Sequence, residues 1–538
     1  MKRIIFLLAL IMPLCGISTL SISAQTTTVK NPWMWIDAPD PDIIRVDDYY
    51  YLVTTTMHVF PGAPIMRSKD LINWETVSYL FDEIHDTPRY DLEEGTVYGR
   101  GQWATTIRYN NGTFWALFVA NDEPHKSMVF KTDDPAKGWT LHGRLPAYHD
   151  ASLFFDDDGR VYVFWGSGDI QLVELEPDLS AEKAGGVRKK LELKGRPSGL
   201  HEGSRVVKHD GMYYLLCVSW PNTGRQQIAY RSNNIEGPYE SKVILKSEFG
   251  GFGYVGQGTI VDGKHGEWYG VIFQDRNGIG RILTLEPCNW IDGWPMLGDE
   301  NYRVPEIMRP YKSGLPKTGI VLPDEFEETK LPLNWQWNHN PVDNAWSLTE
   351  RPGFLRLKTS RVVPNLYLAP NTLTQRMEGP ACSGYICMDL SKMKDGDCAG
   401  LSAFNGDSGV LTVKKIGKKL FLEMSEQKVT LTEREKAVTN VEEKLVETVE
   451  ITKLVNKKQP KIWLRLDGDF RPNGRRGGND AANFYYSVDG EQWSQIGTKN
   501  YRMIFDYRRF FMGTKFGIFN YATKKTGGYV DVDYFKYN

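Results

Sequence analysis

Long apolar runs are almost absent from this chain of 538 residues. The one clear run, residues 4–14, follows two basic residues and precedes small residues at Ser23 and Ala24. It is too short for a membrane span, and the order basic, apolar, small is typical of a secretory signal. We therefore expect residues 1–24 to be a cleaved signal peptide and the mature protein to be secreted or periplasmic, with no membrane span.

Cysteine is also scarce, with six residues in the whole chain and no C-x-x-C spacing. This argues against a zinc site. Loss of Cys15 with the signal would leave an odd number, so not all can pair. Cys217 lies in an apolar stretch, which favours a buried free thiol, whereas one bridge among Cys382, Cys387 and Cys398 is compatible with an oxidising compartment.

Excess positive charge and long helical periodicity are missing as well. The formal net charge is −2, so the sequence has no basic footprint and nucleic acid is not an expected partner. Short aromatic and β-branched segments separated by turn residues dominate instead, which predicts an all-β protein. The length allows two domains.

Five segments of the first half share one plan. Each opens with a large polar or aromatic residue, then a small residue or Pro, then Ser, Thr or Asp, and then β-forming residues. The openings are Asp40-Pro41-Asp42, Trp103-Ala104-Thr105, Asp150-Ala151-Ser152, Glu202-Gly203-Ser204 and Gln257-Gly258-Thr259. They recur roughly every 45–65 residues, the range of propeller blades. We predict a five-bladed β-propeller over residues 28–313.

The second half differs in composition. Residues 312–323 are rich in Gly, Pro and Lys and read as a linker. Alternating strand patterns follow, and the Val and Thr residues of the charged tract 423–458 favour solvated strands over a helix. We predict a jelly-roll-like β-sandwich over residues 320–538.

A propeller places the first strand of each blade around a central channel, so residues at one register converge. Here the converging residues would be Asp40, Trp103, Asp150, Glu202 and Gln257. Three carboxylates beside an aromatic ring and an amide form a glycosidase-like group. In that role Glu202 would be the acid, with its pKa raised by the negative charge of Asp150, and Asp40 would lie far enough away to admit a water.

Each of these residues also has an ordinary structural interpretation. Asp40-Pro41-Asp42 alone is a common turn, Glu202 in a Gly/Ser loop could be merely solvated, and Trp103 alone is more often core. Arg281, after Gly280, is by itself expected to be a solvent-exposed strand residue. The shared register is what favours the catalytic interpretation.

Several of these motifs resemble glycoside hydrolase family 43. Residues 40–45 (Asp-Pro-Asp-Ile-Ile-Arg), 149–154 (His-Asp-Ala-Ser-Leu-Phe) and 201–204 (His-Glu-Gly-Ser) look like its three catalytic motifs, and residues 68–74 and 103–109 also fit it. Residues 335–341 and 516–521 resemble the C-terminal sandwich of its β-xylosidase and arabinofuranosidase branch. The resemblance covers nearly the whole mature chain.

The resemblance implies an inverting hydrolase, with the following expected roles for residues of this chain. Asp40 would be the general base, Glu202 the general acid, Asp150 the residue that tunes and orients the acid, Phe60 and Trp103 ring contacts to the sugar, and Arg281 and Gln257 polar contacts. Many relatives have a channel-facing His where this chain has Gln257, so we do not expect a channel calcium. A loop of the sandwich is expected to close the site.

No cofactor is required for such hydrolysis. A structural calcium in the sandwich is a candidate, with Asp324 and Asp531 as oxygen ligands. The expected partner is a plant cell-wall polysaccharide or oligosaccharide, from which terminal xylose or arabinofuranose would be released; the sequence does not separate the two sugars.

Three alternatives stay open. They are an endo-arabinanase, a noncatalytic carbohydrate-binding propeller, and a retaining invertase-type propeller. The nucleophile motif of the last (Trp-x-Asn-Asp-Pro-Asn) is not matched, because residues 35–40 read Trp-Ile-Asp-Ala-Pro-Asp.

Overall fold

The computed structural model describes residues 29–309, 318–474 and 477–538. The predicted signal peptide and part of the predicted linker lie outside these ranges. Strands dominate the described chain, and its helices are short 3-10 turns: η1 (Pro88–Asp91), η2 (Pro135–Lys137), η3 (Asn277–Ile279), η4 (Asp343–Ala345) and η5 (Leu366–Leu368). No helix among the described residues has the length and apolar character of a membrane span.

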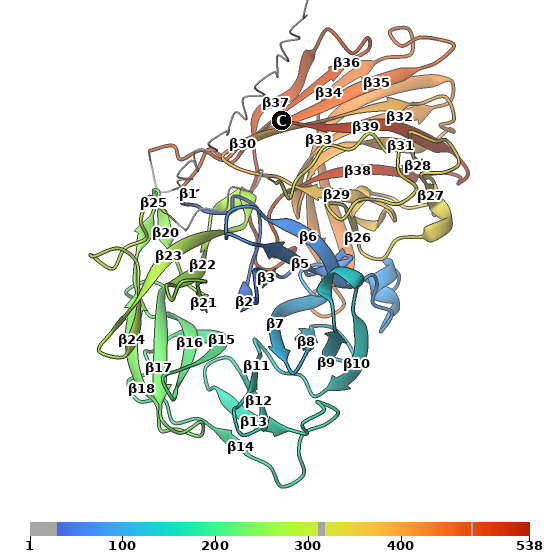
Figure 1. Ribbon diagram of the computed structural model, residues 1–538. Coiled ribbons are helices and arrows are strands. Elements are labelled where there is room, and N and C mark those ends of the chain that lie inside the picture. The colour runs from blue at the N-terminus through green and yellow to red at the C-terminus, as the bar shows by residue number, and fades with distance from the viewer. Residues whose placement is uncertain (1–28, 310–317, 475–476) are drawn as a thin grey trace, which may run out of the picture.

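The first half forms five four-stranded antiparallel sheets around a common axis, as Figure 1 shows. The chain runs through each sheet from the innermost to the outermost strand, and in blade one β4 leaves the sheet between β3 and β5. Blade one is β2 (Asp42–Val46), β3 (Tyr49–Val53), β5 (Gly62–Ser68) and β6 (Glu75–Phe81); blade two is β7 (Gln102–Asn110), β8 (Thr113–Ala120), β9 (Ser127–Thr132) and β10 (Thr140–Leu145); blade three is β11 (Ser152–Phe155), β12 (Val161–Trp165), β13 (Gln171–Leu175) and β14 (Arg188–Lys190). Blade four is β15 (Leu200–His209), β16 (Met212–Trp220), β17 (Gln226–Ser232) and β18 (Glu240–Leu245); blade five is β21 (Gly258–Asp262), β22 (Trp268–Asp275), β23 (Arg281–Ile291) and β24 (Trp294–Leu297).

Polar side chains of the inner strands tie neighbouring blades together. The backbone N–H of Ile107 donates to Asp42 Oδ2 at 3.0 Å, and that of Val206 donates to Ser152 Oγ at 3.0 Å. These groups are buried, so each bond also satisfies a polar atom that would be costly to leave unpaired. Asp42 and Ser152 of the repeated sequence plan therefore each hold an inner strand against that of the next blade.

The chain ahead of blade one packs against blade five. Strand β1 (Val29–Lys30) pairs with β25 (Ile307–Met308), and Met34 bridges Leu283 of β23. A small hairpin, β19 (Glu248–Phe249) and β20 (Phe252–Tyr254), precedes blade five. The two ends of the propeller are thus joined, which closes the ring.

The second half is a sandwich of two large antiparallel sheets. One sheet has the order β34 (Val438–Glu450), β33 (Lys419–Leu431), β32 (Asp407–Ile416), β31 (Asp397–Phe404), β38 (Lys515–Ala522), β29 (Leu373–Arg376), β26 (Gln336–Asn338) and β4 (Val59–Phe60). The other has the order β27 (Trp346–Ser347), β28 (Leu355–Lys358), β39 (Tyr529–Tyr537), β30 (Ala381–Asp389), β35 (Lys461–Asp469), β36 (Ala481–Ser487) and β37 (Ser494–Arg502). The all-β prediction of a propeller followed by a sandwich is confirmed, and the charged tract forms β33 and β34 as expected.

The two halves share both a sheet and a core. Strand β4 comes from the propeller half yet pairs with β26, where Phe60 lies opposite Trp337. Ile279 and Ile282 of the propeller half belong to the hydrophobic cluster that fills the sandwich. The halves are therefore packed as one body, with the sandwich against one side of the propeller (Figure 1).

The five cysteines of the described chain are all buried and free. Cys217 is the buried thiol that was predicted. The structure does not contain the bridge considered among Cys382, Cys387 and Cys398, which lie on strands β30 and β31.

Candidate active site

The five residues of the predicted register converge at one end of the inner strands. Trp103 and Glu202 lie at the starts of β7 and β15, and Asp40, Asp150 and Gln257 lie just ahead of β2, β11 and β21. Those last three have positive φ values of 54°, 48° and 74°. This left-handed conformation is uncommon for residues other than glycine, and such strain gathers at functional sites.

Asp40 is held by donors from three parts of the propeller. Thr55 Oγ1 donates to Asp40 Oδ2 at 2.7 Å, and Gln257 Nε2 and Arg281 Nη1 donate to Oδ1 at 3.1 and 3.2 Å. The side chain is almost fully buried. Three donors offset the cost of burying its charge and fix the orientation of its carboxylate.

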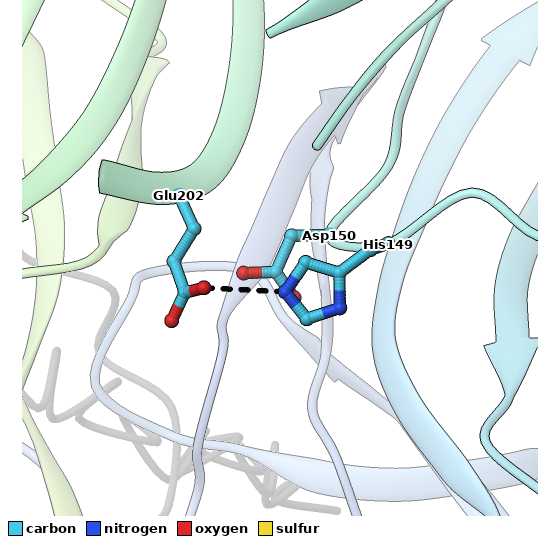
Figure 2. A group of neighbouring side chains, drawn as sticks. All are labelled: His149, Asp150 and Glu202. Carbon is cyan, nitrogen blue, oxygen red and sulfur yellow. Dashed lines mark hydrogen bonds and ion pairs between the residues drawn. The ribbon is translucent and has the colours of Figure 1, made fainter. Parts of the chain in front are cut away.

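Asp150 and Glu202 form a second group together with His149 (Figure 2). Asp150 Oδ2 accepts from the backbone N–H of Gly203 at 2.9 Å, which anchors the residue that follows Glu202. His149 Nε2 lies 3.2 Å from Glu202 Oε2, and Ser167 Oγ donates to that same oxygen at 2.8 Å. Asp150 thus positions the backbone of the predicted acid, while His149 and Ser167 hold its carboxyl group.

The electrostatics of this group differ from the prediction. Burial and the charges of Glu202 and Asp40 raise the pKa of Asp150 to about 6, although His149 opposes this shift. Burial also acts to raise the pKa of Glu202, but the hydrogen bond and the charge of His149 outweigh it, and the pKa of Glu202 is lowered. The expected rise in the pKa of Glu202 is therefore not found, because His149, which the expectation left out, shifts this pKa in the opposite direction.

His149 is the cation of this group. Burial favours its neutral form, but the negative charges of Asp150 and Glu202 and the hydrogen bond to Glu202 raise the pKa of His149 to about 9. The three side chains therefore share their protons as one unit. Their nearest nitrogen and oxygen atoms lie within 4.8 Å of one another, a spacing that could also hold a metal ion.

The axis of the propeller below this site is filled by Arg205, which is buried on the inner strand β15. Its guanidinium donates to five backbone carbonyl oxygens that come from four blades: those of Asp40, Pro41, Thr105, Ala151 and Ser204. Arg205 Nε also lies 3.7 Å from Asp42 Oδ1. A channel calcium does not fit here, because a fixed cation already takes up these oxygens and would repel a second one.

A loop of the sandwich between β37 and β38 covers one side of the site. Arg281 Nη2 donates to the carbonyl oxygen of Phe511 at 3.1 Å, and the Phe511 ring lies 5.9 Å from that of Trp103. The ring of Trp103 in turn lies 5.6 Å from that of His149. Trp103 is half-buried, and Arg281 is buried, which corrects the expectation of a solvent-exposed arginine.

Comparison with known proteins agrees with this geometry. Residues 29–295 match the model of glycosyl hydrolases family 43, and residues 323–538 match the β-xylosidase C-terminal concanavalin A-like domain. A β-xylosidase of Formosa agariphila is 30% identical over 95% of this chain and 90% of its own length. The chain belongs to glycosyl hydrolase family 43. It is a glycosidase of the branch that carries the C-terminal sandwich.

Other relatives of this family 43 enzyme carry related activities. A non-reducing-end α-L-arabinofuranosidase of Bacteroides ovatus is 30% identical over 66% of this chain and 69% of its own length. A bifunctional GH43–CE protein of Bacteroides eggerthii is 39% identical with a TM-score of 0.85, over 95% of this chain and 64% of that protein. An engineered family 43 enzyme with endo-xylanase and exo-arabinofuranosidase activity is 30% identical with a TM-score of 0.84, over 95% of this chain and all of that one.

Phe60 is not part of the site in this family 43 enzyme. It has no exposed surface, because β4 joins the sandwich sheet and its ring packs against Phe81 and Tyr90. The expectation of a sugar contact is corrected on that ground. The rings of Trp103 and Phe511 lie beside the site instead.

The structure does not bring the two predicted calcium ligands together. Both carboxylate oxygens of Asp531 are engaged by Arg356, and Arg351 also donates to Asp531 Oδ2. Asp324 accepts from the backbone N–H of Phe326 and from Trp335 Nε1, and it bridges to Phe535, four residues along β39 from Asp531. The proposed sandwich calcium site is therefore not supported.

Reasoning from the sequence missed several residues of the site. Nothing in the sequence sets His149 apart from the rest of its motif, and the charge of Arg225 acts on Glu202 from blade four. Trp220 is 44% exposed and lies over the Arg225 guanidinium, with 4.3 Å between the ring centroid and the guanidinium carbon. Leu200 pairs with Trp220 and Glu202 with Val218, so the Trp220 ring lies on the same face of the blade as the acid. Side chains alternate between the two faces along β15 and β16, and this alternation is the sequence signal that could have identified Trp220.

Proposed function

We propose that this family 43 enzyme removes terminal xylose or arabinofuranose units from xylan-type oligosaccharides, with inversion at the anomeric carbon. The proposal rests on one observation: two carboxyl groups at one mouth of the propeller are held by separate sets of hydrogen-bond partners. Asp40 is held by Thr55, Gln257 and Arg281, and Glu202 by His149 and Ser167. The names of the relatives, which include β-xylosidases and an α-L-arabinofuranosidase, support the choice of substrate.

Hydrolysis by inversion needs a base that activates water and an acid that protonates the departing oxygen. We assign the base to Asp40, whose fixed carboxylate can accept a proton from water. Glu202 is the acid and must hold a proton when the glycosidic bond breaks. Asp150 positions Glu202 through the Gly203 N–H, and the proton shared by Asp150, Glu202 and His149 is the source of the proton that Glu202 donates.

An exo mode of attack is supported by the sandwich loop. Phe511 contacts both Arg281 and Trp103, so one side of the mouth is walled by the second domain. A long chain crossing the mouth would meet this wall, whereas a chain end can enter. Endo attack is the second candidate, because the engineered relative has endo-xylanase activity.

The decisive experiment measures which sugars are released from arabinoxylan oligosaccharides. Single xylose or arabinose units are expected, and release of oligosaccharides alone would overturn the exo mode. Glu202→Gln is expected to lower turnover on these substrates by about 10²–10⁴-fold, and less on a nitrophenyl glycoside, because that leaving group needs little protonation. Equal losses on both substrates would remove Glu202 from the role of acid.

Two further features belong to the proposal. The reaction requires no cofactor, so chelator treatment should leave turnover unchanged. The protein is exported, as the pattern of residues 1–24 suggests, and N-terminal sequencing of the mature protein tests this. A noncatalytic sugar-binding propeller would bind the same oligosaccharides and release nothing.

A further inference from the structure

A large cavity lies between the propeller and the sandwich, next to the site. It has a volume of about 1060 Å³ and is lined from the propeller by Gly99, Arg100, Trp103 and Asn121. The sandwich lines it with residues 428–433 and Lys436, around the turn that joins β33 and β34, and with the loop before β38. We call this cavity the interdomain groove.

The inner end of the interdomain groove meets the active site. Trp103 and Phe511 line the groove, and they are the rings that flank His149 and Arg281. Tyr507 continues the aromatic wall, with its ring 5.1 Å from that of Phe511, and it is 48% exposed. A saccharide bound at the site can therefore extend along rings into the groove, and aromatic faces are a usual surface for sugars.

The interdomain groove carries an excess of positive charge, although the whole chain has a net charge of −2. Five cationic side chains and three anionic ones line it. Two of the anions, Asp407 and Asp506, are both bound by Arg509. Among the described residues, no carboxylate lies within ion-pair distance of Lys428, Lys436 or Arg508.

Lys436 shows the effect of this imbalance. Its Nζ donates to the backbone carbonyl oxygen of Arg508 at 2.9 Å. Burial and the positive charge of Arg100 lower the pKa of Lys436, against the weaker opposite effect of Glu433. Arg100 is itself held against the sandwich, because its Nη2 donates to the carbonyl oxygen of Glu433 at 2.8 Å. Arg100 is also paired with Asp122, whose Oδ1 lies 3.4 Å from its Nη1, so Lys436 is the cation of this pair that has no carboxylate within ion-pair distance among the described residues.

The groove is also firmly built. Gly99 has a φ of 69°, and a Cβ at this position would lie 2.4 Å from the carbonyl oxygen of Arg509. The Thr96 N–H donates to the carbonyl oxygen of Glu435, and its hydroxyl donates to that of Lys436. These contacts fix the distance between the two walls, so the cationic side chains face a preformed space.

We propose that the interdomain groove binds a carboxylate-bearing sugar of the substrate, so that the enzyme prefers xylan oligosaccharides that carry a uronic acid beyond the terminal unit. This inference rests on the proposed function, because it concerns the part of the chain that extends from the same site. A carboxylate satisfies the unpaired cations Lys428, Lys436 and Arg508, while the sugar rings lie against Trp103 and Tyr507. A neutral oligosaccharide makes only the contacts with these two aromatic rings.

The test compares kcat/KM for xylotriose and for xylotriose with one glucuronic acid on a unit other than the non-reducing end. At low salt the wild-type enzyme should favour the acidic substrate by about threefold to tenfold, the worth of one or two exposed ion pairs. The preference should shrink as salt rises. The combined variant Lys428→Gln and Arg508→Gln should lose it. Lys418→Gln removes an exposed lysine at the far turn of the β32–β33 hairpin and should retain it.

Equal kcat/KM values for the two substrates in the wild type would overturn the inference, as would a preference that survives in the combined variant. Calorimetric titration of the wild type with both trisaccharides gives a readout that does not depend on turnover. If neither substrate nor a nitrophenyl pentoside is hydrolysed, the proposed function fails, and the ratio of the two binding constants still decides whether the groove selects a carboxylate.

Discussion

Replacement of Arg205 by methionine is the sharpest test of how the propeller holds its site. The substitution keeps much of the side-chain volume and removes the guanidinium that joins four blades. The substitution also removes the cation that lies 3.7 Å from Asp42 Oδ1, whereas Arg108 still donates to Asp42 Oδ2 at 2.6 Å. Breaking a buried ion pair from one side costs about 3–5 kcal/mol. The carbonyl oxygen of Asp40 also loses a donor, so the backbone of the base is less firmly held.

The assay is a thermal scan of the enzyme with kinetics on a nitrophenyl pentoside at a temperature where the variant is folded. For a domain of about 280 residues, whose unfolding entropy is about 0.6 kcal/mol/K, 3–5 kcal/mol corresponds to a fall in Tm of about 5–9 °C. Arg205→Lys is the matched control: it keeps the charge but cannot reach all five carbonyl oxygens, so an intermediate Tm is expected. A methionine variant with the Tm and kcat of the wild type would refute the reasoning.

Three further predictions concern the charged groups. Asp40→Asn should lower kcat by about 10²–10⁴-fold on oligosaccharides and nitrophenyl glycosides alike in steady-state assays, because both need the activated water. His149→Gln removes the cation beside Asp150 and Glu202, so these acids should keep their proton to higher pH; the basic limb of kcat/KM against pH should move upward. Burial raises the pKa of Glu286 to about 8, so the folded chain keeps a proton that the unfolded chain releases above about pH 4. Stability should therefore fall between about pH 4 and pH 8, and Glu286→Gln should flatten this loss in denaturant titrations at pH 5 and pH 8.

Each of these has an outcome that contradicts it. Activity of Asp40→Asn on the nitrophenyl substrate alone would place the base elsewhere, with Asp42 as the next candidate. A basic limb that stays in place or moves down in His149→Gln would mean that the imidazole does not set the protonation of the pair. An unchanged pH dependence in Glu286→Gln would assign the loss of stability to other groups.

The fold and the catalytic register could be predicted because both depend on sequence patterns that are local to each blade. In each opening a small residue or Pro and then Ser, Thr or Asp accompany an inner strand, and in two blades that residue, Asp42 or Ser152, bonds to the next blade. Since every blade repeats this start, closing the ring brings the first residues together. The order of the acids around the mouth then follows from chain order alone.

Roles that depend on partners from distant segments could not be predicted. Arg205 looks like an ordinary strand residue, and its carbonyl partners come together only when the ring closes. The family resemblance implies a sugar contact for Phe60, but its two-residue strand belongs to the sandwich sheet. The lowered pKa of Glu202 depends on the imidazole of His149, which lies against this carboxyl group only in the folded chain.

The second domain takes part in holding the catalytic base. Asp37 Oδ1 accepts from the Arg281 N–H, and its Oδ2 accepts from the N–H of Gly513 in the sandwich loop. Arg281 then spans the junction, with one nitrogen on Asp40 and another on the carbonyl oxygen of Phe511. The direction of the Asp40 carboxylate therefore depends on a contact between domains that are far apart in sequence. Because these groups are buried, moving the loop would leave charged donors and acceptors unpaired, at a cost of about 1–3 kcal/mol each. The sandwich is thus a structural part of the active site, and the wall it provides leads directly into the interdomain groove.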